Sequence, residues 1–249
     1  MNRTRSGVPA TYVLIHGAAA DSWCWHLLAA ELRDRGHDVV TVDLPCADES
    51  AGLPEYADAV VEAVGARTNL VVVAHSLGGF TAPLVCDRAP VRLLVMLQAM
   101  VPLPGETPGQ WWAATGYDQA RSEQDRRDGR AEDDLVTLFV RDLPPELAAE
   151  ALSRQKAQAS TPFTQPWPLP AWPDVPTKFL LSSGDRFFPA DFMRRVVRER
   201  LHITPDEVPG DHLPMLGHPT ELADRLEEYW TQQQQPSESP SPQRHQAPL

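Results

Sequence analysis

The segment Ala74-His75-Ser76-Leu77-Gly78-Gly79 holds a serine whose surroundings suit nucleophilic catalysis. It directly follows the apolar run 70–73, which is typical of a buried strand. A serine hydroxyl is a poor nucleophile at neutral pH. A protein that uses one must expose it, place a base beside it and provide donors for the developing oxyanion. A sharp turn from strand to helix, with Ser76 at its apex, meets the first of these needs.

Such a turn requires small residues two positions before and two positions after the serine, because larger side chains would collide across it. Gly78 meets this requirement fully. Ala74 stands where the usual pattern has glycine, and its methyl group weakens the motif taken alone. If Ser76 is a nucleophile, the rest of the chain must therefore supply a base and an acid that orients it.

Two later strand candidates each lead into a side chain suited to one of these roles. The apolar run 178–181 is followed by Asp185, and a weaker strand at 203–208 is followed by His212. Functional side chains of open α/β sheets gather at the carboxyl ends of the strands, so both are expected near Ser76. Because chance placement of all three residues is much rarer than that of one, the order nucleophile, acid, base predicts a Ser-His-Asp triad.

Apolar runs alternate with helical periodicity along the chain, which predicts a mostly parallel α/β sheet of about six strands with helices on both faces. Strands are expected at residues 12–15, 39–44, 70–73, 92–97, 178–181 and 203–208. Helices are expected at residues 23–35, 56–64, 77–87, 191–200 and 219–230. Pro205 marks the last, weak strand as an edge strand, where a missing amide hydrogen is tolerated.

The domain organisation follows from composition. Residues 1–100 and 175–230 are expected to form the core. The stretch 101–174 is too long for a simple crossover and predicts an inserted helical cap over the strand ends. Residues 231–249, rich in Gln, Pro and Ser, predict a disordered tail. The cap tryptophans could line a substrate pocket or could equally bury the cap against the core: Trp111, Trp112, Trp167 and Trp172.

The chain resembles the α/β-hydrolase superfamily, and within it the plant-type methylesterases, hydroxynitrile lyases and their bacterial esterase relatives. The residues that carry the resemblance are His16-Gly17-Ala18 with Trp23-Cys24-Trp25, Asp43-Leu44-Pro45, the segment 74–79, Gly184-Asp185 with Phe188-Pro189-Ala190-Asp191-Phe192, and Gly210-Asp211-His212 with Met215-Leu216 and Pro219. It covers about residues 12–230 and is weakest through the cap. The resemblance implies an α/β-hydrolase fold. The sequence shows no metal-ligand spacing and no phosphate-binding glycine loop, so no metal and no cofactor are expected.

The resemblance also implies a role for each residue of the site. Ser76 would attack a carbonyl carbon, His212 would take and return the proton, and Asp185 would fix the imidazole tautomer. The backbone amides of Ala18 and Leu77 would form the oxyanion hole.

Several neighbouring polar residues are competing candidates. His16 is expected to shape the loop that carries Ala18, and His75 to pack beside the nucleophile. His218, six residues beyond His212, is the rival base, but it lies at the approach to the last helix. Asp211 is too close to His212 along the chain to orient it easily. Gln98 occupies the place where some family members keep their acid, and its neutrality strengthens Asp185.

The expected function is hydrolysis of a carboxylic ester of a small, largely apolar molecule through an acyl-enzyme. Thioesterases and carbon–carbon bond hydrolases use the same triad, so both stay open. Hydroxynitrile lyases keep a lysine directly after the catalytic histidine, whereas this chain has Leu213. Dehalogenases and epoxide hydrolases of this fold have an aspartate in place of Ser76. A non-catalytic ligand receptor with an intact triad is an alternative of another class.

Composition excludes other classes of protein. With 34 acidic and 22 basic residues the net charge is -12, which disfavours a broad nucleic-acid-binding surface. Three scattered cysteines, Cys24, Cys46 and Cys86, suit a reducing compartment better than a disulfide framework. No run approaches the roughly 18 apolar residues of a membrane helix, and the first apolar run is too short for a signal peptide. A soluble, cytoplasmic enzyme is therefore expected, with its oligomeric state left open.

Overall fold

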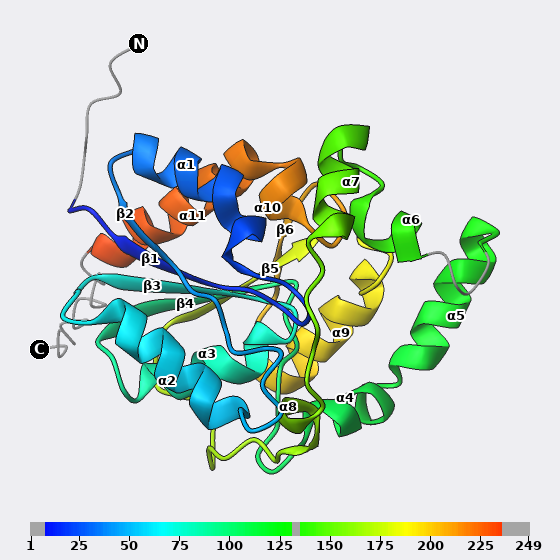
Figure 1. Ribbon diagram of the computed structural model, residues 1–249, viewed down its shortest axis with the longest axis horizontal. Helices are drawn as coiled ribbons and strands as arrows, with labels where there is room; N and C mark the ends of the chain where they lie inside the picture. The colour runs from blue at the N-terminus through cyan, green and yellow to red at the C-terminus, as the bar shows by residue number, and fades with distance from the viewer. Residues whose placement is uncertain (1–7, 131–134, 236–249) are drawn as a thin grey trace, which may run out of the picture.

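A computed structural model describes residues 8–130 and 135–235 of the chain. At its centre lies a six-stranded, wholly parallel sheet in the order β2-β1-β3-β4-β5-β6 (Figure 1). The strands are β1 (Thr11–Ile15), β2 (Asp38–Thr41), β3 (Leu70–His75), β4 (Val91–Leu97), β5 (Thr177–Ser182) and β6 (Asp206–Val208). The predicted α/β architecture is confirmed, and β6, directly after Pro205, lies at an edge of the sheet.

Helices cover both faces of this sheet. The core helices are α1 (His26–Asp34), preceded by the short 3-10 helix η1 (Ser22–Trp25), α2 (Leu53–Val64), α3 (Gly78–Cys86), α9 (Ala190–Leu201), α10 (Pro214–Gly217) and α11 (Pro219–Gln234). In the part of the chain that the structure describes, none of the helices has the length and apolar character needed to span a membrane.

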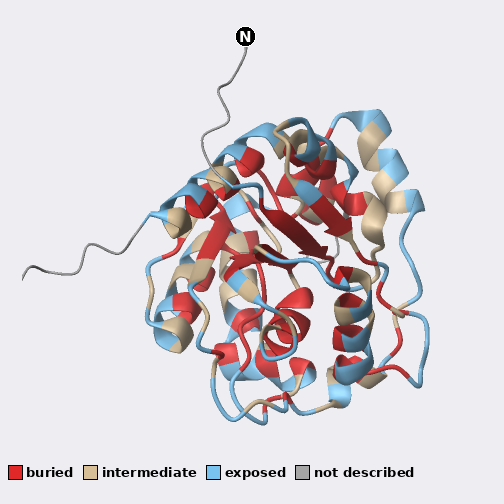
Figure 2. Cartoon of the chain, turned by 90° about the vertical axis from the view of Figure 1, so that its left-hand side faces the viewer, coloured by how far each residue is buried: buried red, intermediate tan, exposed pale blue. Residues whose placement is uncertain are grey.

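Side chains of the central strands alternate between two apolar layers. In β1, Tyr12 and Leu14 pack into the layer that includes α1 and α11, whereas Val13 and Ile15 pack into the layer that includes α2, α3 and α9. Every residue of β1 and β3 is buried, and Figure 2 shows the strands enclosed by helices with exposed outer faces. Burial on both faces is why these strands read as continuous apolar runs in the sequence.

The described residues between β4 and β5, in the stretch predicted as a cap, form five further helices. They are α4 (Pro108–Thr115), α5 (Tyr117–Asp128), α6 (Leu135–Val140), α7 (Pro145–Ser153) and α8 (Thr161–Thr164). Figure 1 shows them in the right-hand half of the view, with α5 outermost. The exact limits of core and cap remain a prediction, and residues 131–134 lie outside the described residues.

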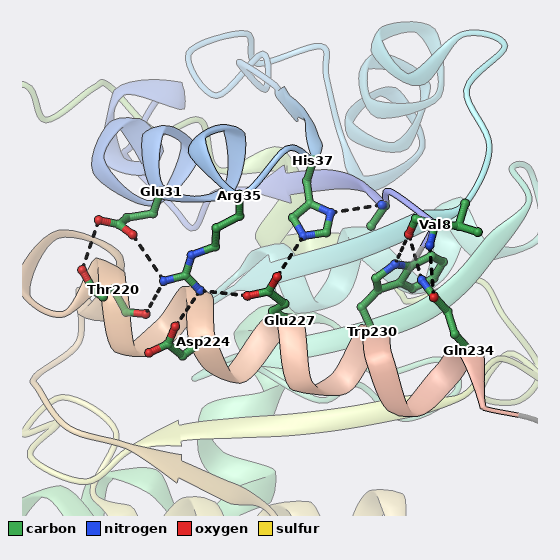
Figure 3. Close-up of polar contacts among 10 residues, drawn as sticks. Val8, Glu31, Arg35, His37, Thr220, Asp224, Glu227, Trp230 and Gln234 are labelled. Atoms are coloured by element: carbon green, nitrogen blue, oxygen red, sulfur yellow. Dashed lines mark hydrogen bonds and ion pairs between the residues drawn. The ribbon is translucent and has the colours of Figure 1, made fainter. Parts of the chain in front are cut away.

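The last helix extends past its predicted end at Trp230 and is held to the start of the chain (Figure 3). The indole Nε1 of Trp230 donates to the carbonyl oxygen of Val8 at 2.7 Å. The side-chain amide of Gln234 donates to the same oxygen at 2.8 Å and accepts from the Val8 N–H at 3.2 Å. The predicted disordered tail is therefore wrong for 231–234, which are helical. Gln235 caps this helix, and residues 236–249 of the predicted tail lie outside the described residues.

Arg35, at the end of α1, joins this helix to α11 (Figure 3). Its side chain is only 8% exposed and lies 2.8 Å from Asp224. Glu31 and Glu227 lie 3.3 and 3.4 Å from the same guanidinium. One buried cation thus bridges three acidic side chains and reduces the repulsion among them.

We expect Arg35→Ala to lower the free energy of unfolding by about 1–3 kcal/mol, a range discounted for the partial exposure of the three acids. Added salt should reduce this loss, because it screens the repulsion left in the variant. Urea denaturation at low and high salt measures both effects. The control is Arg225→Ala, which breaks an exposed pair with Glu228 and should cost less than about 1 kcal/mol. Equal losses in the two variants would contradict the role of Arg35.

Candidate active site

Ser76 lies at the apex of the turn between β3 and α3. Its φ is +52°, in the left-handed region that non-glycine residues rarely adopt. The carbonyl oxygen of Ser76 accepts N–H groups from Gly79 at 3.1 Å and Met100 at 3.0 Å, which hold this backbone in place. A strained backbone held in this way is typical of functional sites.

The close approach of neighbouring segments explains why the turn needs small residues. A Cβ at Gly78 would lie 2.9 Å from the carbonyl oxygen of His16, and one at Gly17 would lie 2.8 Å from the Ser76 Cβ. Ala74, which replaces the usual glycine, is fully buried in the apolar layer beneath the turn. The structure thus accommodates the extra methyl group of Ala74 without opening the turn.

His212 and Asp185 come together as the sequence predicted. His212 follows β6, Asp185 follows β5, and the His212 Nδ1 lies 2.7 Å from the Asp185 Oδ2. Both residues are buried. An ionised carboxylate only accepts hydrogen bonds, so Nδ1 carries the proton and Nε2 is left as an acceptor. This is the tautomer that a general base at Nε2 requires.

Asp185 is held by three further donors. Its Oδ1 accepts the N–H groups of Phe187 at 2.7 Å and Phe188 at 3.1 Å. Its Oδ2 accepts from Gln98 Nε2 at 2.6 Å, and Gln98 also donates to the Phe188 carbonyl oxygen at 3.0 Å. The acid and its orientation are therefore fixed by the end of β4 and by its own loop.

Ser76 and His212 open into one cavity of about 340 Å³, which the predicted oxyanion donors Ala18 and Leu77 also line. Most of its wall is apolar, and the cap supplies much of it. The cap residues of the wall are Trp112, Phe139, Val140, Ala151, Leu152, Arg154, Gln155 and Phe163. A cavity of this size and character suits a small, largely apolar ligand.

Of the predicted pocket tryptophans, only Trp112 lines the cavity. Trp111 and Trp167 are buried in the core, where their indole Nε1 groups donate to Val101 and Phe80 carbonyl oxygens at 3.1 and 3.2 Å. Trp172 packs on Trp167, with ring centroids 6.1 Å apart. For Trp111 and Trp167 the pocket assignment was therefore wrong, because these rings hold the cap to the core.

Two phenylalanines that the sequence did not single out flank His212. The rings of Phe139 and Phe187 lie 5.3 and 5.0 Å from the His212 ring, measured between centroids, and both line the cavity. Phe187 stands two residues after Asp185. This closeness to the predicted acid is the feature of the sequence that could have placed Phe187 in the site. Phe139 belongs to the short apolar helix α6, whose place over the site depends on the tertiary structure.

Two of the competing histidines, His16 and His218, do not line the cavity and contact groups of the surrounding structure. His16 Nδ1 lies 2.8 Å from the Gly17 carbonyl oxygen, and its Nε2 accepts the Leu44 N–H at 3.1 Å. The strand β2 ends at Thr41, before the predicted end at 44. In the segment that follows, the Leu44 N–H bonds to His16 instead of a neighbouring strand. His218 is absent from the cavity wall and lies 3.8 Å from Glu221 of α11.

His75 holds the backbone of His212. Its Nε2 donates to the His212 carbonyl oxygen at 2.8 Å. Burial, together with the nearby His212, lowers the pKa of His75 well below the ordinary value of 6.5. The folded protein therefore keeps this imidazole neutral at pH values where the unfolded chain binds a proton.

This difference predicts that stability falls as the pH falls below about 6.5, because the unfolded state binds the extra proton. His75→Gln retains an amide donor for the His212 carbonyl oxygen but cannot titrate. Between pH 6.5 and 5 we expect the variant to lose less stability than the wild type, by up to about 1.4 kcal/mol per pH unit. Urea midpoints at pH 7, 6 and 5 measure this. Parallel pH profiles for the two proteins would contradict a neutral His75.

The chain is similar to known proteins in sequence and in fold. A sequence profile described as the alpha/beta hydrolase family matches residues 12–225. Methylesterase 9 from Arabidopsis thaliana is 27% identical over 250 residues, covering 86% of this chain and 96% of that protein. Norfluorocurarine synthase 1 from a Strychnos species is 23% identical over 261 residues, covering 87% and 94% respectively.

A solved structure has a similar fold. An extracellular alpha/beta-hydrolase from a Paenibacillus species matches with a TM-score of 0.72 at 20% identity, covering 88% of this chain and 98% of that one. The methylesterase match confirms the resemblance seen in the motifs, and the profile extends from β1 into α11. The chain therefore belongs to the alpha/beta hydrolase family.

Proposed function

We propose that this alpha/beta hydrolase cleaves a carboxylic ester of a small, largely apolar molecule with Ser76 as its nucleophile. One observation carries the proposal: His212, oriented by Asp185 at 2.7 Å, shares an apolar cavity with a serine on a strained strand-to-helix turn. A nucleophile, a base and an orienting acid with these roles define serine hydrolysis, independently of the fold.

Each residue has a defined part in the reaction. His212 Nε2 takes the Ser76 hydroxyl proton as the oxygen attacks the ester carbonyl carbon, and Asp185 stabilises the resulting imidazolium. The amides of Ala18 and Leu77 stabilise the oxyanion, a contribution worth about 10²- to 10³-fold in rate for each donor. His212 then protonates the departing alkoxide, and water hydrolyses the acyl-enzyme by the same steps in reverse order.

Esters are favoured over the other substrates of this triad. The Arabidopsis relative is named a methylesterase, whereas the residue after His212 is Leu213, not the lysine of hydroxynitrile lyases. Thioesters, and molecules with an activated carbon–carbon bond beside a carbonyl group, also contain a carbonyl carbon that Ser76 could attack. They are therefore the second candidate substrates. The apolar wall, with Trp112, Phe139 and Phe187 close to the reacting groups, favours apolar acyl or alcohol groups of modest size.

The test is a graded panel of acyl esters and thioesters with matched leaving groups. We expect turnover of short, apolar acyl esters, with kcat/KM falling for charged acyl groups, because a charge would lose its hydration in the cavity. Faster turnover of the thioesters would move the assignment to a thioesterase. If folded protein turned over no member of the panel and reacted with no fluorophosphonate probe, a receptor role would replace the proposal.

A further inference from the structure

Ala19 has a strained backbone directly beside the predicted oxyanion donor Ala18. Its φ is +53°, in the left-handed region, although its side chain is not glycine. Both residues line the cavity that contains Ser76. A non-glycine residue keeps this conformation only when its surroundings hold it there. The groups that hold Ala19 therefore constrain the backbone directly beside the Ala18 N–H.

A cap segment between α7 and α8, residues 155–159, supplies those groups; we call it the strap. The side-chain Oε1 of Gln158 accepts the Ala19 N–H at 3.0 Å. The backbone N–H of Lys156 donates to the Ala19 carbonyl oxygen at 2.9 Å. Both backbone polar groups of Ala19 are thus bound by the strap. Lys156 Nζ also pairs with Asp21, two residues further along the same loop, at 3.0 Å.

The Gln158 amide is itself oriented by the core. Its Nε2 donates to the Tyr56 hydroxyl at 3.1 Å and to the Ala159 carbonyl oxygen at 3.1 Å. Tyr56 is buried on α2, and the Ala159 N–H donates to the Cys46 carbonyl oxygen at 2.6 Å. With Nε2 engaged in this way, Oε1 is the atom that faces Ala19.

We infer that Gln158 is a positioning residue for the oxyanion hole: it holds Ala19 in its left-handed conformation and so aims the Ala18 amide at the substrate carbonyl oxygen. The inference rests on the proposed serine mechanism. An oxyanion donor stabilises the transition state only when it is already aimed at the developing charge. The strap also lines the cavity through Gln155, so one cap segment contacts the ligand space and sets a donor of the reaction.

The chain offers a matched control in Gln165. Its Oε1 also accepts a core backbone N–H, that of Leu53 at 2.9 Å, but at the start of α2 and outside the cavity wall. Gln165→Ala therefore removes a similar bond between cap and core without touching the oxyanion loop. If only the docking of the cap on the core mattered, both variants would lose kcat. If the orientation of the Ala18 amide matters, only Gln158→Ala should lose kcat.

We expect Gln158→Ala to lower kcat about 10- to 100-fold, which is less than the effect of losing an oxyanion donor outright. KM should change less than about threefold, because binding of the ground-state carbonyl depends little on the Ala18 amide. Inhibition by a trifluoromethyl ketone, whose adduct carries an oxyanion, should weaken by a similar factor. Gln165→Ala should keep kcat within about threefold. Equal kcat values for the two variants, or an effect confined to KM, would overturn the inference.

Ala19→Gly provides a rescue, because glycine adopts a positive φ without support. Added to Gln158→Ala, it should recover a large part of the lost kcat, while added to Gln165→Ala it should recover nothing. A double variant no better than Gln158→Ala alone would show that the Ala19 conformation is not the link.

Hydrogen exchange separates this inference from the proposed function. In folded protein, Gln158→Ala should speed amide exchange in residues 17–20, and Gln165→Ala should leave it unchanged. If the wild type hydrolysed no ester, the proposed function would be wrong. The hydrogen-exchange rates of residues 17–20 would still test whether the strap holds this loop. If the wild type were active but exchange in this loop stayed the same in both variants, the inference alone would fail.

Discussion

Ser76→Ala should abolish nearly all ester hydrolysis, with kcat lowered by about 10⁵- to 10⁶-fold and KM little changed. In the proposed mechanism the hydroxyl oxygen of Ser76 forms the acyl-enzyme. Among the described residues no other serine lines the cavity, and the left-handed backbone at position 76 presents this one to it. Steady-state kinetics on the best ester of the panel measures the loss. A fluorophosphonate probe should label the wild type once per chain and leave the variant unlabelled.

The control is Ser182→Ala. Ser182 is also a buried serine at the end of a parallel strand, β5, but it does not line the cavity. We expect this variant to keep its activity and its labelling. The serine mechanism would be wrong if Ser76→Ala, freed of any contaminating wild-type enzyme, still hydrolysed the ester.

The three residues of the proposed triad could be predicted because their positions follow from the topology. Parallel strands bring their carboxyl ends to one edge, so the side chains that follow β3, β5 and β6 had to lie near one another. The structure accordingly places His212 2.7 Å from Asp185 and in the same cavity as Ser76. The strands themselves were readable because burial on both faces makes each a continuous apolar run.

The cap was less predictable because adjacent residues on a helix point in different directions. Trp111 and Trp112 are neighbours on α4, yet the first is buried in the core and only the second lines the cavity. Which side of α4 faces the core depends on contacts with distant residues such as Phe188, whose ring lies 5.5 Å from that of Trp111. Sequence periodicity in a short helix does not contain that information.

Long-range hydrogen bonds were the other feature that the sequence did not reveal. Gln234 lies in a polar stretch typical of a disordered tail, but it pairs with Val8 across 226 positions of the chain. Gln158 is likewise an ordinary polar residue of a loop until the fold brings it to Ala19, 139 positions away. A single side-chain amide has no periodicity, so its partner becomes visible only in three dimensions.

Asp185→Asn should lower kcat by about 10⁴-fold while the fold stays intact. The substituted side chain keeps one carbonyl oxygen, and the N–H groups of Phe187 and Phe188 hold that oxygen at the Oδ1 position. Its NH₂ group must then occupy the Oδ2 position, facing His212 Nδ1 and the Gln98 amide. Two donors cannot bond, so the imidazole must turn Nδ1 into an acceptor. The proton moves to Nε2, and His212 can no longer take the Ser76 proton.

Asp211→Asn is the matched control, because Asp211 is also buried and stands directly before His212. Its carboxylate accepts the N–H groups of Leu213 and Asp142, both at 3.1 Å, rather than the imidazole, and burial raises its pKa. We therefore expect this variant to lose less than about tenfold in kcat. NMR of the His212 ring should show the proton on Nδ1 in the wild type and in Asp211→Asn, and on Nε2 in Asp185→Asn. If Asp211→Asn instead lost as much activity as Asp185→Asn, with the ring tautomer unchanged in both, orientation by Asp185 would not be the source of the effect.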